Sequence, residues 1–125
     1  MGAEVFEQTA SGKNPADAFG KAVEAAQYDH GHSGYTGTIA EKGGYTLMKL
    51  PEGVTISQAL EWVDSLGSEP AEHKRFAKTC FDIYDDKWGD ALAFEYLGAD
   101  LEELRGDAKD VDGTRWFLFT GWASS

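Results

Sequence analysis

The chain has 125 residues, of which 42% are hydrophobic and 13% aromatic, and its formal net charge at pH 7 is −11. A chain of this length buries roughly two thirds of its unfolded surface, so we expect one domain that folds without disulfides. Cys80 is the only cysteine, which excludes an intramolecular disulfide and favours a reducing compartment. No basic region followed by an apolar run opens the chain, and no apolar run approaches the roughly 20 residues of a membrane-spanning helix. We therefore expect a cytoplasmic protein with no signal peptide and no membrane partner.

The negative charge is concentrated in one stretch of the sequence. Residues 1–53 carry seven acids and four bases, and residues 54–125 carry fifteen acids and seven bases. Residues 82–112 alone hold eleven acids and three bases. Such a surface repels nucleic acids and anionic membranes, because it offers no counterion release. This excludes direct nucleic-acid binding and leaves a protein with a basic surface as the expected partner.

The first half of the chain predicts one helix among several strands. Residues 3–10 have strand character, and Asn14 with Pro15 is typical of a helix start. Apolar residues then recur at helical spacing up to about Asp29: Phe19, Ala22, Val23 and Ala26. Residues 36–41 and 45–50 predict two further strands joined as a hairpin across residues 42–44.

The second half predicts two more helices and two more strands. Thr55 and Gln58 form a capping-box pattern that begins a helix ending near Leu66. Pro70 opens another helix, whose apolar stripe is His73, Phe76, Ala77, Cys80, Ile83 and Tyr84. The remaining expected elements are a strand at 91–97, a brief helical turn capped by Asp100, a polar loop at 105–113 and a strand at 115–119.

These elements follow the order β-α-β-β-α-α-β-(α)-β over residues 1–125. The order predicts a single α+β domain. We expect a mixed or antiparallel sheet of about five strands, with three main helices packed on one side.

The first candidate site is a partner-binding site at the start of the acidic run. Trp88 lies between aspartates, and an aromatic residue inside a charged rim is the usual arrangement of a protein-binding hot spot. The carboxylates could also imitate the phosphates of a nucleic acid, whereas the simpler interpretation is a solvated face that keeps the protein soluble. The candidate partner-binding residues are Asp82, Asp85, Asp86, Trp88 and Asp90.

The glycine-rich segment after the first helix is the second candidate site. Its backbone N–H groups could converge on an anion, although it matches neither of the common phosphate-binding glycine patterns. The residues that could contact a phosphate or ribose are His30, His32, Ser33, Tyr35 and Thr36. The alternative is an ordinary helix end followed by a turn, since glycine commonly terminates helices. His30 and His32 match no metal-binding spacing, so we expect neither a metal nor a cofactor.

Cys80 is the one candidate nucleophile. His73 lies seven residues earlier on the same helical face, about 10 Å away along the axis, which is too far for a direct hydrogen bond. We therefore expect Cys80 to be a small buried hydrophobic residue and the protein to carry no catalytic residues.

Three segments resemble a family of small uncharacterised proteins of bacteriophages and mobile elements. They are HGHSGYTGTIAEK at 30–42, DDKWGDALAFEYLG at 85–98 and RWFLFTGWASS at 115–125. Thr120 stands where the family pattern suggests an aromatic or small residue. The resemblance implies an accessory protein in the cytoplasm of a bacterial host that blocks a host factor, such as a CRISPR effector.

The sequence therefore favours a non-enzymatic acidic binding protein that inhibits a host factor handling nucleic acid or defence. One alternative is a binder or hydrolase of a phosphate-bearing small molecule or nucleotide that uses residues 30–37. Another is an assembly protein with an oligomer contact at Trp88 or Trp122.

Overall fold

The computed structural model describes residues 2–30, 36–107 and 115–124. These residues form one α+β domain with a four-stranded sheet. The elements in chain order are β1 (Ala3–Gly12), α1 (Pro15–His30), η1 (Ile39–Glu41, a 3₁₀ helix), β2 (Tyr45–Leu47), α2 (Ile56–Asp64), η2 (Ala71–His73, also 3₁₀), α3 (Lys74–Asp85), β3 (Ala91–Glu95), α4 (Gly98–Asp107) and β4 (Arg115–Ser124).

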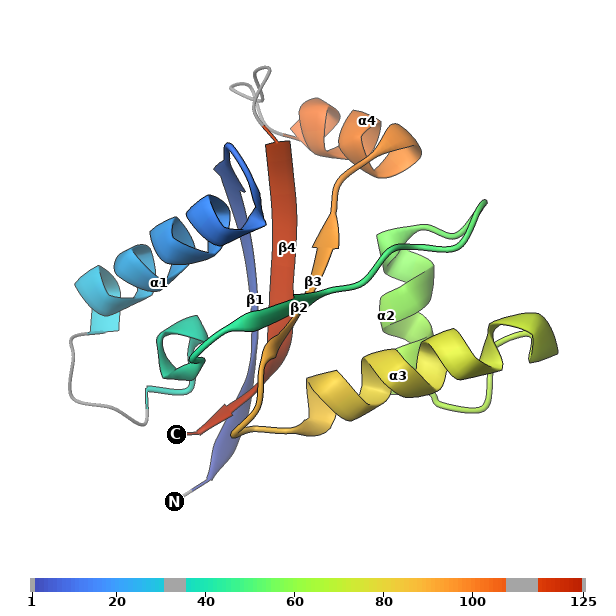
Figure 1. Cartoon of the computed structure of the whole chain (residues 1–125), viewed down its shortest axis with the longest axis horizontal. Helices are drawn as coiled ribbons and strands as arrows, with labels where there is room; N and C mark the ends of the chain where they lie inside the picture. Colours follow the sequence, from blue (N-terminus) through green and yellow to red (C-terminus); the bar gives the residue numbers. More distant parts are fainter. Residues whose placement is uncertain (1, 31–35, 108–114, 125) are drawn as a thin grey trace.

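The sheet is mixed, as the sequence predicts, with strand order β1-β4-β3-β2 (Figure 1). β4 pairs antiparallel with both β1 and β3, and β2 pairs parallel with β3. The β1–β4 ladder runs from Ala3 opposite Ser124 to Gly12 opposite Arg115. β4 is longer than predicted because its pairing with β1 continues past Phe119 to Ser124.

Helices cover both faces of the sheet, so the prediction that they pack on one side is wrong. Phe117 and Phe119 of β4 pack in a cluster with α1 and η1, whereas Leu118 packs in a second cluster with α2 and α3. Figure 1 shows α1 on one side of the strands and α2 with α3 on the other. The physical reason is the composition of β3 and β4, whose successive side chains are apolar on both faces and must be shielded from water on both.

The predicted strand at 36–41 is also wrong, and the hairpin with it. The Thr38 hydroxyl accepts a hydrogen bond from the Ala40 N–H at 3.2 Å and thereby caps the 3₁₀ helix η1. A threonine that satisfies the backbone locally offers it an alternative to a β-ladder. The sheet therefore has four strands rather than about five, and β2 pairs with β3 across the α2–α3 crossover.

The helix starts predicted at Asn14 and Thr55 are confirmed, whereas the α-helix predicted to open at Pro70 begins at Lys74, after the 3₁₀ helix η2. The Asp17 N–H donates to Asn14 Oδ1 at 2.8 Å, and both hydrogen bonds of the Thr55–Gln58 capping box are present. α4 is a ten-residue helix rather than a brief turn. Asp100 does not cap its own helix: both carboxylate oxygens accept the Ile56 N–H, at 3.2 and 3.1 Å, so Asp100 stabilises the start of α2.

Residues 108–113 of the predicted polar loop lie outside the described residues. Within the part of the chain that the structure describes, no helix is both long and apolar enough to cross a membrane.

Candidate functional site

Among its described residues, the acidic run does not form one continuous face. Residues 82–90 form the end of α3 and the turn into β3, at one end of the sheet. α4, with Glu102 and Glu103, lies at the other end (Figure 1). Glu95, between them, holds Arg115 through two hydrogen bonds of 2.9 and 2.8 Å. The described carboxylates therefore do not form a continuous row like the phosphates of a nucleic acid. The candidate site is reduced to the residues around Trp88.

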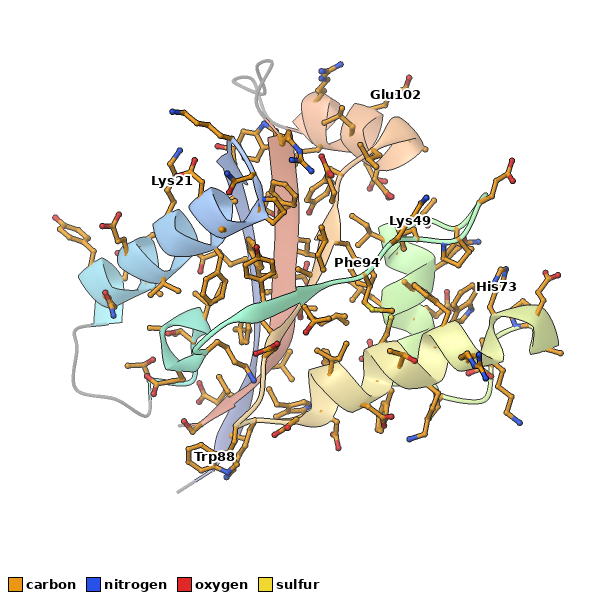
Figure 2. The ribbon with its side chains drawn as sticks, viewed as in Figure 1. Lys21, Lys49, His73, Trp88, Phe94 and Glu102 are labelled. Atoms are coloured by element: carbon orange, nitrogen blue, oxygen red, sulfur yellow. The ribbon has the colours of Figure 1, made fainter. Side chains whose placement is uncertain are left out.

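Trp88 is the large apolar side chain that is exposed in this region. Its exposed fraction is 67%, against 8% for Trp62, and it projects from the turn after α3 (Figure 2). Trp88 and Trp122 are the two tryptophans predicted as possible contacts, and Trp122 is partly buried, so Trp88 is the more exposed of the two. Trp116 is also partly buried. We call residues 85–90 the Trp88 loop. The Trp88 ring therefore takes no part in the buried core and is accessible from outside.

Hydrogen bonds fasten the Trp88 loop to the domain. One Asp86 carboxylate oxygen accepts the Trp88 N–H at 3.0 Å, and the Asp86 carbonyl accepts the Gly89 N–H at 3.2 Å. Asp90 accepts the Thr46 hydroxyl at 2.8 Å, which ties the loop to β2. The ring is thus presented on a backbone that is already ordered.

Lys42 is a buried residue that holds the Trp88 loop through a hydrogen bond. Its side chain is only 5% exposed, and its Nζ donates to the Asp86 carbonyl at 2.8 Å. Burial lowers the pKa of the Lys42 amine, and the nearby carboxylates of Asp86 and Asp90 partly oppose that shift. Sequence reasoning missed this residue, because nothing local links Lys42 to a carbonyl 44 positions away.

The charge around Trp88 is nearly balanced in the folded protein. Asp82 pairs with Lys78 at 2.6 Å, and the Lys87 amine lies 5.2 Å from the centre of the Trp88 ring. Three lysines therefore lie in the same region as the four predicted aspartates, and the formal charge of the group is −1. The lysines are Lys42, Lys78 and Lys87. Asp85 is exposed, and no ion pair to its carboxylate is found among the described residues. The site is therefore an apolar ring with a mildly acidic rim.

The second candidate site is only partly described. His32, Ser33 and Tyr35 lie outside the described residues, and His30 ends α1. Thr36 is held by Glu41, whose carboxylate accepts its N–H at 3.1 Å and its hydroxyl at 2.8 Å. A carboxylate bound at this position disfavours a phosphate there, because the two anions repel each other.

Cys80 and His73 do not form a catalytic pair. The Cys80 side chain is fully buried, and burial raises the pKa of its thiol to about 12. The His73 ring stacks on Trp62, with the ring centres 5.3 Å apart. The expectation that Cys80 is a buried hydrophobic residue is confirmed. Among the described residues, no three His, Cys, Asp or Glu side chains are grouped in a way that could hold a metal ion.

Comparisons with known proteins add no relative. No family model matches the chain, and neither the curated proteins nor the solved structures contain a match.

Proposed function

We propose that this protein acts by binding another protein through the Trp88 loop, without catalysing a reaction. The observation that carries the proposal is the 67% exposure of Trp88 on a loop that Lys42, Asp86 and Asp90 hold in place. Tryptophan is enriched among the residues that dominate binding energies, because its ring buries a large apolar area at the centre of an interface.

The order of the loop supports the same conclusion. Binding costs less when the contact residues do not have to be immobilised on association. The N–H groups of Trp88 and Gly89 are both hydrogen-bonded to Asp86, so the backbone that carries the ring is fixed in the free protein. The loop therefore offers a preorganised apolar anchor.

The charge of the rim favours a basic partner. Asp85, three residues before Trp88, is exposed, and the whole chain carries a formal charge of −11. Attraction between opposite charges accelerates encounter and selects among partners more than it adds affinity. The resemblance to proteins of bacteriophages and mobile elements suggests the class of partner. It is a host factor that handles nucleic acid or defence, such as a CRISPR effector, which the protein inhibits by occupying a basic surface.

The test is affinity capture from a bacterial lysate and from purified CRISPR complexes, followed by titration of each captured protein. Wild type is compared with Trp88→Ala and Asp85→Lys. Loss of a hot-spot tryptophan weakens binding by about 2 kcal/mol or more, roughly 30-fold in Kd. Asp85→Lys is expected to slow association and to reduce its salt dependence.

Glu102→Lys supplies the matched control, because Glu102 is exposed on α4 at the opposite end of the sheet (Figure 2). It makes the same change of charge as Asp85→Lys without touching the Trp88 loop. The proposal fails if Trp88→Ala binds every captured protein as tightly as wild type does.

A further inference from the structure

A second surface, at the other end of α3 from Trp88, carries the opposite charge. A cavity of about 660 Å³ lies between the first half of α3 and the segment that follows α2. Lys74, Arg75 and Lys78 line it, together with Leu66 and Ala71. Three of the chain's eleven lysines and arginines thus meet at one cavity of a protein whose formal charge is −11.

Two of these cations are available to a ligand. Lys78 pairs with Asp82 at 2.6 Å, but no hydrogen bond or ion pair to the side chains of Lys74 and Arg75 is found within the described ranges. Glu69 is the one acid among the residues that line the cavity, and its carboxylate accepts the Gly67 backbone N–H at 2.9 Å and pairs with neither Lys74 nor Arg75. The cavity therefore presents two unpaired positive charges.

The stability of α3 does not explain this arrangement. A helix is stabilised by acids in its first turn and bases in its last turn. α3 has Lys74 and Arg75 in its first turn and Asp82 and Asp85 in its last, which is the reverse order. The helix dipole therefore does not account for the two cations at the start of α3.

The apolar part of the wall defines the ligand further. Leu66 is 44% exposed beside the cations, and the exposed Leu66 side chain gains by being covered. The segment that leads into α3 is held to the domain, since the His73 ring stacks on Trp62 and the His73 backbone N–H donates to the Pro70 carbonyl at 2.9 Å. The volume lies in the usual range of small-molecule sites, about 300–1,000 Å³.

We propose that this cavity binds a small organic anion, in which a phosphate, sulfonate or carboxylate group is joined to a short apolar group. The anionic group contacts Lys74 and Arg75, and the apolar group covers Leu66 and Ala71. The site lies at the other end of α3 from the Trp88 loop (Figure 2 labels His73 and Trp88), and Lys78, which pairs with Asp82, is not one of the two cations that contact the anionic group.

The test is a titration followed by amide NMR, with hexyl phosphate as the probe. Inorganic phosphate and 1-hexanol serve as its charged and apolar halves. We expect hexyl phosphate to bind at least tenfold more tightly than either half and to shift the amides of Gly67, Ala71 and Thr79. Lys74→Gln/Arg75→Gln should weaken it about tenfold, which corresponds to about 0.7 kcal/mol for each of the two exposed charges.

The control is Lys21→Gln/Lys49→Gln, which removes two exposed cations elsewhere and should leave the affinity within about twofold. Equal binding of inorganic phosphate or hexanol would overturn the proposal. So would shifts confined to Met48, Leu50 and Val54, which line a separate apolar cavity of about 620 Å³. Absence of any shift at millimolar probe would overturn it as well.

Discussion

Replacing Lys42 by methionine removes the support of the Trp88 loop while keeping an apolar side chain of similar length. The variant loses the hydrogen bond from the amine to the Asp86 carbonyl, which measures 2.8 Å. A hydrogen bond to a charged group contributes about 1.5–3 kcal/mol. Two effects reduce the loss: the Asp86 carbonyl keeps the Gly89 N–H, and the cost of burying a charge disappears. We expect a net destabilisation of about 1–2 kcal/mol at pH 7.

The dependence on pH gives this experiment a second readout. The pKa of Lys42 is lowered by burial, so the unfolded state holds the proton more tightly than the folded state does. Between the lowered pKa and the ordinary value of 10.5, the stability of wild type therefore rises with pH relative to Lys42→Met. Burial raises the pKa of Tyr84 and Tyr96, which lowers stability above pH 10, but both proteins share that effect and it cancels in the comparison.

The assay is urea unfolding from pH 7 to 10.5, combined with hydrogen exchange at pH 7. Lys49→Met makes the same charge change at an exposed position and should stay within about 0.5 kcal/mol of wild type. We expect the Trp88 and Gly89 amides to exchange faster in Lys42→Met only. If Lys42→Met matches Lys49→Met in stability and in exchange at these amides, Lys42 does not support the loop.

Three further predictions concern the core and the helix caps. Thr120→Val should destabilise the fold by about 1–2 kcal/mol in urea unfolding, because the buried hydroxyl donates to the Phe6 carbonyl at 2.7 Å, whereas Thr120→Ser should recover most of the loss. Cys80 should react with iodoacetamide at pH 8 about a thousandfold more slowly in folded than in urea-unfolded protein, given a pKa of about 12 against 9.0; fast labelling of the folded protein would contradict its burial. Asp100→Ala should cost about 1 kcal/mol by removing the acceptor of the Ile56 N–H at the start of α2, and Asp100→Asn less, because the amide oxygen can still accept it; equal losses would argue against this role of Asp100.

Local chemistry in the sequence predicts much of the fold. Asn14 and Thr55 mark helix starts correctly, because a capping hydrogen bond depends on residues two or three positions apart. The β-branched residues of the segment 36–41 favour a strand, but local hydrogen bonds to Thr38 and Glu41 prevail. The two-sided covering of the sheet could have been inferred from the uninterrupted apolar run of β4.

The candidate site is only half predictable. Trp88 and its flanking aspartates are neighbours in the sequence, so composition alone identifies them. Lys42, in contrast, meets Asp86 only because β2 pairs with β3, and strand pairing is a property of the whole chain. For the same reason, the acidic run looks continuous in the sequence although the fold places residues 82–90 and α4 at opposite ends of the sheet.

The measurement that tests the central claim most directly is hydrogen exchange of the protein bound to a captured partner, compared with the free protein. If the Trp88 loop is the contact, peptides covering residues 85–90 should be the most strongly protected on binding. Peptides from α4 should exchange as they do in the free protein. Protection of α4 or of the first turns of α3, with residues 85–90 unchanged, would contradict the claim that Trp88 anchors the partner.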